Sequence, residues 1–351
     1  MFSKTKVRNE SRRIMLVAMA ACLCSLVTVH AQRGSPAVGK QRILISAPSG
    51  KAELAALMSF DSFDWSKPQP GAKRAILIFH GKGRDVEGYY QTALKAAAIA
   101  GNASGNTVFI APQFLTNEDD CVDCKSEKLL HWRGTAWESG TPALGPAHIG
   151  TFEIIDFLLA HLADRSLFPN LESIILAGHS GGAQLTQRYA VVGRQLAALR
   201  QSAIRLRFVI ANPSSYLYFS KDRPSSSAGC PAFNRWKYGL IDPPAYVGGT
   251  SAAAWRQLEA DYARRDVIYL LGTADNDPHQ EDLDVSCAGE AQGPFRLARG
   301  QAYFKYLHDR NQAEWNQHLR YVPGVAHSAR GMFTSVCGVN ALFDAGSCQD
   351  Q

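Results

Sequence analysis

Short apolar runs alternate with helix-length amphipathic segments along most of the chain. The runs are rich in β-branched side chains and predict seven strands, at 42–46, 75–80, 107–111, 173–177, 206–211, 267–271 and 318–322. Helical spacing lies between them, at 86–101, 148–164, 182–201, 251–265 and 296–311. Strands that are apolar throughout and separated by helices predict an α/β fold, in which helices cover both faces of a mostly parallel sheet.

Two long segments interrupt this alternation. Residues 112–147 and 213–250 are aromatic, rich in Gly, Pro and Ser, and both contain cysteines. Loops of this length inside a compact domain are usually functional or disordered, and the cysteines and tryptophans favour ordered loops. We therefore expect a single domain over 32–351 with two ordered insertions.

Residues 1–31 are typical of a cleaved signal peptide. Five basic residues precede an apolar stretch at 14–29, and Val29-His30-Ala31 fits a small-x-small cleavage site. The apolar stretch is shorter than the roughly 20 residues that span a bilayer, which disfavours the alternative of an uncleaved anchor. Arg12 and Arg13 partly match a twin-arginine signal. We expect a secreted or periplasmic protein with no stable membrane insertion after cleavage.

The net charge carries little information about partners. The formal charge of +6 falls to about +2 without residues 1–31, because these hold five basic residues and one acidic residue. No concentrated Lys/Arg run with interleaved aromatics remains, so we expect no nucleic-acid partner.

Six of the eight cysteines lie after residue 31, and an even count in an exported protein predicts disulfides. Proximity favours Cys121 with Cys124 and Cys337 with Cys348, which leaves Cys230 with Cys287. The alternative for Cys121 and Cys124 is half of a zinc site with His131. A second CxxC is missing, so we expect no metal.

Gly178-His179-Ser180-Gly181-Gly182 follows the strand at 173–177 and opens a helix. In this setting GxSxG is a nucleophile elbow, a tight strand-to-helix turn that exposes the serine hydroxyl. Ser180 is the candidate nucleophile, and the alternative is a plain strand-to-helix turn. A serine hydroxyl reacts at neutral pH only with an adjacent base, so the chain must also supply one.

An acid and a histidine follow the serine in the chain order that such folds use. Asp275 comes just after the strand at 267–271, and His327 lies in the loop after the last strand. Asp277 is the alternative acid, less favoured because it lies farther from the strand end. His327 would act as general base and then general acid, while Asp275 would hold its tautomer. The acidic run 275–284 could instead bind calcium, but it lacks the glycine of a calcium loop.

The tetrahedral oxyanion needs two N–H donors. One is expected from Gly181, directly after the nucleophile. The other is expected from Lys82 or Gly83, in the loop after the strand at 75–80.

The His80-Gly81 loop, the Gly-His-Ser-Gly-Gly elbow, the late aspartate and the last-loop histidine together resemble the α/β-hydrolase superfamily, across nearly all of 32–351. The resemblance implies a mostly parallel sheet of about eight strands and acyl transfer by a Ser-His-Asp triad, without a cofactor. Many members carry a long helical cap after the sixth strand, whereas this chain has only the irregular segment 213–250.

The function expected from these motifs is an exported hydrolase of small-molecule or polymeric carboxylic esters. An amidase or peptidase with the same triad is the alternative, and a non-catalytic binding protein on the same scaffold is a further one. Trp132, Trp137 and Tyr216 fall in the insertions and predict an aromatic substrate cleft. The alternative for these rings is that they pack the insertions onto the domain.

Overall fold

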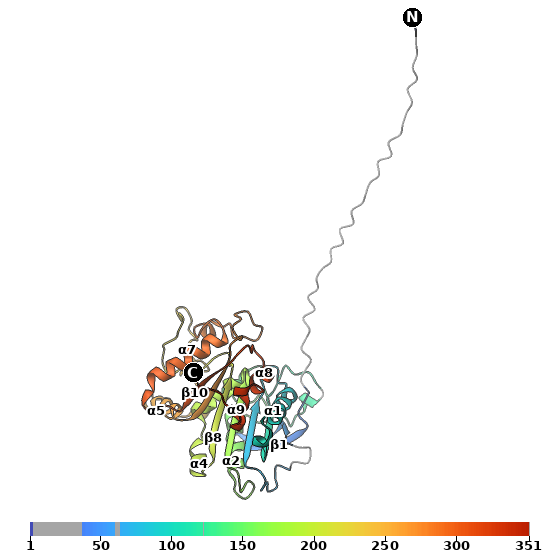
Figure 1. The fold of residues 1–351 in the computed structure, drawn as a ribbon, viewed down its shortest axis with the longest axis vertical. Helices are drawn as coiled ribbons and strands as arrows, with labels where there is room; N and C mark the ends of the chain where they lie inside the picture. Colours follow the sequence, from blue (N-terminus) through green and yellow to red (C-terminus); the bar gives the residue numbers. More distant parts are fainter. Residues whose placement is uncertain (3–36, 60–63, 122, 351) are drawn as a thin grey trace. The chain divides into compact units, whose positions relative to one another are not determined.

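The computed structural model describes residues 1–2, 37–59, 64–121 and 123–350 (Figure 1). The signal peptide expected at 1–31 therefore lies outside the described residues, except for its first two. The described residues from 37 onward form one compact unit, and the fold below is that of this unit. Within the described ranges, no helix combines the length and apolar character needed to cross a membrane.

The central sheet has eight strands in the order β1-β2-β4-β3-β7-β8-β9-β10. β1 and β2 pair antiparallel, β2 pairs antiparallel with β4, and all other neighbours are parallel. This confirms the α/β class and the mostly parallel sheet. The bounds are Gln41–Ala47 (β1), Gly50–Met58 (β2), Arg74–Phe79 (β3), Thr107–Gln113 (β4), Ser173–His179 (β7), Arg205–Ala211 (β8), Asp266–Gly272 (β9) and Gln317–Val322 (β10).

β2 is the strand that the sequence pattern does not predict. Its residues, GKAELAALM, include no β-branched side chain and have the composition of a helix. Pairing with β1 and β4 on its two sides overrides this local preference, because strand formation depends strongly on tertiary context.

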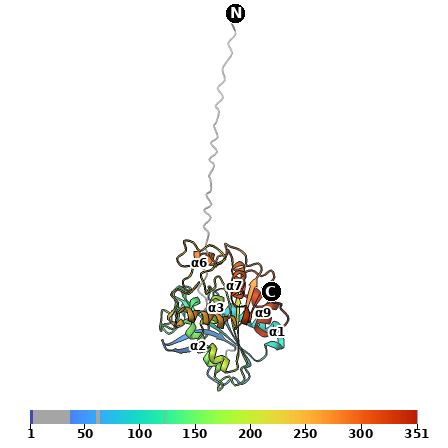
Figure 2. The same cartoon turned by 90° about the vertical axis from the view of Figure 1, so that its left-hand side faces the viewer.

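Alternate residues of the central strands enter two separate cores, one on each face of the sheet. In β3, Ile76 and Ile78 pack with α1, α8 and α9, whereas Ala75, Leu77 and Phe79 belong to the larger core under α2, α3, α5 and α7. Figure 1 and Figure 2 both show α1 and α9 side by side. The two-sided burial explains why these strands are apolar throughout.

The helices follow the predicted positions with one split and three additions, α6, α8 and α9. The bounds are Val86–Ala100 (α1), Thr151–Ala163 (α2), Gly181–Val192 (α3), Leu196–Gln201 (α4), Ala252–Ala263 (α5), Cys287–Glu290 (α6), Arg296–Arg310 (α7), Ala329–Phe333 (α8) and Val336–Phe343 (α9). The single helix predicted over 182–201 is wrong. The chain leaves α3 at Gly193, where a Cβ would come within 2.7 Å of the Tyr189 ring.

The described parts of the two insertions pack against α3, whose twelve residues are all buried. The first contains two short strands, β5 (Leu115–Thr116) and β6 (His131–Trp132), and the 3₁₀ helices η2 (Asp123–Lys125) and η3 (Ala136–Ser139). The Arg188 guanidinium of α3 donates to the Glu138 carbonyl at 3.2 Å and to the Lys237 carbonyl at 3.1 Å. One buried side chain therefore fastens both insertions to the same helix.

All three disulfides have the expected pairing. Cys121–Cys124 lies within the first insertion, and Cys337–Cys348 ties α9 to the C-terminal segment. Cys230–Cys287 joins the second insertion to the start of α6. Because Cys121 and Cys124 are bonded to each other, they are not available as zinc ligands.

His80 shapes the loop that follows β3. Its Nε2 accepts a hydrogen bond from the Phe114 N–H at 2.9 Å, so its proton lies on Nδ1, which donates to the Gly81 carbonyl at 2.9 Å. The ring packs edge-on against Trp137, with 4.8 Å between the ring centroids. Burial lowers the pKa of His80 to about 4, so this loop is built around a neutral imidazole.

Removing the Cys230–Cys287 disulfide should destabilise the fold more than removing Cys121–Cys124. The first bond closes a loop of 57 residues and the second a loop of 3. Loop-closure entropy assigns about 4 kcal/mol to the long loop and about half of that to the short one. Urea denaturation of the two double Cys→Ser variants measures the difference. Equal midpoints, or a lower midpoint for the short-loop variant, would contradict it.

Acidification should destabilise the protein through His80. Its pKa is about 4 in the folded state and about 6.5 in the unfolded chain, so between these values the unfolded chain binds more protons. Stability therefore falls as the pH drops through this window, by about 3 kcal/mol for this group. Urea denaturation at pH 7.5 and pH 4.5 measures the change. His80→Gln should show a shallower pH dependence, and an unchanged dependence would refute this role.

Candidate active site

Ser180 stands at the turn between β7 and α3 with φ 57° and ψ −118°. This left-handed conformation is uncommon for a residue other than glycine and costs on the order of 1–3 kcal/mol. The Ser180 N–H donates to the Ala211 carbonyl at 3.0 Å, and its carbonyl accepts from the Gln184 N–H at 3.1 Å. The first bond joins the turn to the end of the neighbouring strand β8 and the second lies in the first turn of α3, so they hold the strained backbone in place.

The two flanking glycines of the motif are required by close contacts. A Cβ on Gly178 would lie 2.2 Å from the Gly182 carbonyl. A Cβ on Gly182 would lie 2.2 Å from the Phe79 carbonyl, at the end of the neighbouring strand β3. The strand–turn–helix setting that the GxSxG pattern predicts is therefore present, with the turn pressed against β3.

The structure brings Ser180, His327 and Asp275 into one hydrogen-bonded chain. His327 Nε2 lies 3.0 Å from the Ser180 hydroxyl oxygen, and His327 Nδ1 lies 2.8 Å from Asp275 Oδ2. The carboxylate accepts from Nδ1–H, which leaves Nε2 to accept the serine proton. Asp277, the alternative acid, accepts instead from the exposed His279 N–H at 2.8 Å.

Close contact between the last two loops explains why Asp275 meets His327. The Ala274 N–H donates to the Val325 carbonyl at 3.0 Å, and the Thr273 N–H donates to the Val322 carbonyl at 3.1 Å. A Cβ on Gly272 would lie 2.4 Å from the Val325 carbonyl. The loop after β9 is thereby joined to the loop after β10 within three residues of the acid.

Arg296 is a second partner of Asp275 that the sequence reasoning missed. Its side chain has no exposed surface, and Nη1 lies 3.4 Å from Asp275 Oδ1. Its Nε donates to the Ser214 hydroxyl at 2.9 Å. Burial lowers the pKa of Arg296, and the Asp275 carboxylate opposes that shift. Arg296 therefore contacts one oxygen of the Asp275 carboxylate, and His327 contacts the other.

His179 packs against His327, with 4.5 Å between the ring centroids. Burial, followed by the positive charges of His327 and Arg296, holds the pKa of His179 well below its usual range. Its Nδ1 shares a hydrogen bond of 2.9 Å with the Tyr89 hydroxyl. The elbow histidine is therefore neutral, and it does not repel a positive charge on His327.

The predicted oxyanion loop lies against the nucleophile. A Cβ on Gly81 would come within 3.4 Å of the Ser180 Cβ. The Arg84 N–H donates to the Gly81 carbonyl at 3.0 Å, closing a turn around Lys82 and Gly83. The Lys82 ammonium lies 3.6 Å from Asp282, which ties this turn to the loop after β9. On the other side, Gly181 begins α3, where helix geometry leaves N–H groups without intrahelical partners.

Trp132, Trp137 and Tyr216 have no exposed surface. Trp132 donates from Nε1 to the Thr141 carbonyl at 2.9 Å, and Tyr216 stacks on Tyr303 at 4.4 Å between centroids. Trp137 stacks on Phe114 and reaches the elbow, 3.1 Å from where a Gly181 Cβ would stand. The three rings are therefore placed as expected if they pack the insertions onto the domain, and not as expected for an open substrate cleft.

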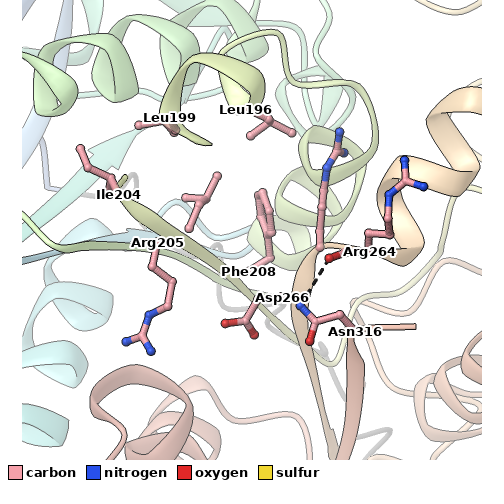
Figure 3. A pocket seen from close by; sticks show the side chains of 10 residues that line it. Leu196, Leu199, Ile204, Arg205, Phe208, Arg264, Asp266 and Asn316 are labelled. Atoms are coloured by element: carbon pink, nitrogen blue, oxygen red, sulfur yellow. Dashed lines mark hydrogen bonds between the residues drawn. The ribbon is translucent and has the colours of Figure 1, made fainter. Parts of the chain in front are cut away.

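The four segments that carry the predicted catalytic and oxyanion residues all follow the carboxyl ends of strands, where parallel α/β sheets place their sites. The pocket of Figure 3 lies at the opposite edge, by the first residues of β8 and β9, Arg205 and Asp266. It has a volume of about 310 Å³, and its lining includes none of the predicted site residues. No group of three His, Cys, Asp or Glu side chains in the described part of the chain could hold a metal ion.

Comparison with known proteins adds to this geometry. No protein-family model and no curated protein matches the chain. Among solved structures, a poly(3-hydroxybutyrate) depolymerase from Bordetella parapertussis is 19% identical, with a TM-score of 0.61 over 88% of this chain and 92% of its own. A poly(aspartic acid) hydrolase from Sphingomonas sp. KT-1 is 21% identical, with a TM-score of 0.56 over 85% of this chain and 96% of its own.

These identities are low, so the likeness concerns the fold. Each of the two structures matches most of this chain and most of its own chain. The central sheet has the number of strands and the mostly parallel pairing that the resemblance implies. The chain has the α/β-hydrolase fold.

Proposed function

We propose that the protein is a serine hydrolase that cleaves carboxylic esters through an acyl-serine intermediate. The observation that carries this proposal is the hydrogen-bonded chain from Ser180 through His327 to Asp275, with distances of 3.0 and 2.8 Å. A nucleophile, a base and an orienting acid in this order form the constellation that makes a serine hydroxyl reactive.

In the acylation step, the Ser180 hydroxyl oxygen attacks the ester carbonyl carbon while His327 Nε2 accepts its proton. Asp275 stabilises the imidazolium that forms, and Arg296 helps to hold this carboxylate in position. The tetrahedral oxyanion accepts hydrogen bonds from the N–H of Gly181 and from that of Lys82 or Gly83. When the intermediate collapses, His327 returns the proton to the leaving alcohol.

Deacylation repeats these steps with water. His327 removes a proton from the attacking water, the same N–H groups hold the second oxyanion, and Ser180 leaves with the proton that His327 returns. No step requires a metal or a cofactor. The two similar structures described above are named for polymers, which supports testing polymeric as well as small-molecule esters.

Export to an oxidising compartment is part of the proposal. Three disulfides link six cysteines, and such bonds persist in secreted and periplasmic proteins but are rare in the cytosol. They support the signal peptide that the sequence predicts at residues 1–31.

Ser180→Ala and His327→Ala should each abolish ester turnover, because one removes the nucleophile and the other its base. The fold should survive, since neither side chain carries the packing of the elbow. Turnover of p-nitrophenyl butyrate, with circular dichroism as the check on folding, measures both effects. Normal turnover in either folded variant would refute the triad.

Asp275→Asn should lower kcat by about 10⁴-fold, because an amide in this position favours the wrong histidine tautomer. Asp277→Asn is the matched control, since its carboxylate accepts from a backbone N–H in an exposed loop. We expect it to keep kcat within a few-fold of the wild type. A larger loss of kcat in Asp277→Asn than in Asp275→Asn would show that Asp277, and not Asp275, is the acid of the triad.

Esters should be cleaved faster than amides of the same acyl group. A panel of p-nitrophenyl esters against the matching p-nitroanilides compares the two leaving groups on one acyl-enzyme. Anilide turnover that equals or exceeds ester turnover would favour an amidase or peptidase instead.

A further inference from the structure

A cluster of charged side chains from both insertions lies beside the first turn of α3. Glu138 comes from the first insertion, Lys237 from the second and Asp284 from the loop after β9. The Lys237 ammonium lies 3.5 Å from Glu138 Oε2 and 3.6 Å from Asp284 Oδ2. The Glu138 side chain is 4% exposed and that of Lys237 is 22% exposed, so the cluster is buried with one open side.

Glu138 reaches the residue that follows the nucleophile. A Cβ on Gly181 would stand 2.5 Å from Glu138 Oε1. The N–H of Gly181 is the proposed donor to the oxyanion. A carboxylate oxygen therefore lies within a few ångströms of the group that would hold the substrate carbonyl.

Hydrogen bonds around Gln184 fix the orientation of this carboxylate. Gln184 Oε1 accepts from the Ser215 hydroxyl at 2.6 Å and from Arg188 Nη2 at 3.2 Å. Its amide nitrogen must therefore face Glu138, where it donates to Oε2 at 3.1 Å. Since the Gln184 nitrogen and Lys237 can only donate, Glu138 is the acceptor of both and forms an ion pair with Lys237.

The second carboxylate oxygen is left facing the elbow. Both donors reach Oε2, and among the described residues none reaches Oε1. This oxygen is not among the fully buried atoms without a partner, so it is accessible to solvent or to a ligand. A negative charge beside the oxyanion would oppose the tetrahedral intermediate of a plain aliphatic ester. A hydrogen-bond donor on the substrate would offset this repulsion.

We propose that Glu138 Oε1 binds a hydroxyl or ammonium group on the acyl part of the substrate. This inference rests on the proposed ester hydrolysis. The leaving oxygen must lie at His327, which protonates it, whereas Glu138 lies at the oxyanion amide. The donor therefore belongs to the acyl chain, on the carbon α or β to the carbonyl. Esters of hydroxy or amino acids are the substrate class that this site fits.

The test compares three p-nitrophenyl esters with one acyl skeleton: pentanoate, 3-hydroxypentanoate and 3-aminopentanoate. Each kcat/KM is divided by the rate of hydroxide hydrolysis, which removes differences in intrinsic reactivity. The wild type should favour at least one donor-bearing ester over pentanoate by about tenfold or more, the factor that 1.4 kcal/mol produces. The ester that gains shows whether the donor is a hydroxyl or an ammonium.

Two variants assign the preference to Glu138. Glu138→Ala should abolish it for both donors. Glu138→Gln should lose the ammonium preference and keep part of the hydroxyl preference, because Gln184 and Lys237 hold its amide oxygen at the Oε2 position and its NH2 group can donate only to a hydroxyl. Glu172→Gln, an exposed glutamate paired with Lys73, is the matched control and should keep the wild-type ratios. A purely structural role for Glu138 would lower all three rates together and leave their ratios unchanged.

The outcomes separate this inference from the proposed function. Turnover of all three esters by the wild type without preference would overturn the role of Glu138 and leave ester hydrolysis intact. A preference that persists in Glu138→Ala would also overturn it. No turnover of any ester would overturn both. If Glu138→Ala does not fold, the ratios of kcat/KM among the three esters in the wild type and in Glu138→Gln still test the role of Glu138.

Discussion

The close approach of the β7–α3 turn to the end of β3 is the constraint on which the site depends. Gly182 packs directly on the Phe79 carbonyl, and Gly178 packs on Gly182, so neither position has room for a side chain. Ser180 is forced into a left-handed conformation between them. Its hydroxyl then stands clear of the sheet, where the loops after β3, β9 and β10 can reach it.

Tertiary contacts on every side maintain this strained turn. The Ser180 N–H is held by β8 through Ala211, and α3 is buried along its whole length beneath the two insertions. Arg188 fastens both insertions to α3 through two backbone carbonyls. The strain at the nucleophile is thus supported by hydrogen bonds and packing spread over much of the chain, as is usual for strained functional residues.

Charged side chains lie on two sides of the nucleophile, next to the histidine and next to the oxyanion amide. Asp275 is shared between His327 and the buried Arg296, while His179 stays neutral beside His327. On the oxyanion side, Glu138 is joined to Lys237, which is joined in turn to Asp284. The carboxylate of Glu138 and the buried ring of Trp137 therefore both lie next to the elbow, while Trp132 and Tyr216 lie in the core.

Local pattern and chain order predict most of the fold and the three side chains that the structure brings together. Ser180 has a motif, Asp275 and His327 follow strand ends in a fixed order, and two-sided burial makes the parallel strands visible as apolar runs. β2 escapes this reasoning because its composition is helical and only pairing with β1 and β4 makes it a strand. The break at Gly193 also escapes this reasoning, because the apolar pattern continues through 182–201 while the backbone leaves the helical conformation there, with ψ 129°.

The charged side chains that contact the site could not be predicted from the sequence for a similar reason. Arg296 lies 21 residues after its partner Asp275. Glu138 lies 46 residues before its partner Gln184. Neither residue belongs to a motif. Each acquires its place only when distant segments fold together. An arginine or a glutamate in such a segment is otherwise typical of a solvated surface.

The central claim is that Ser180 is an activated nucleophile. Incubating the purified protein with a fluorophosphonate and mapping the adduct by mass spectrometry tests it most directly, because such a probe phosphonylates serine only where a base activates it. The account predicts a single stoichiometric adduct on Ser180. An unlabelled Ser180 in a folded sample, or an adduct on another residue, would contradict it.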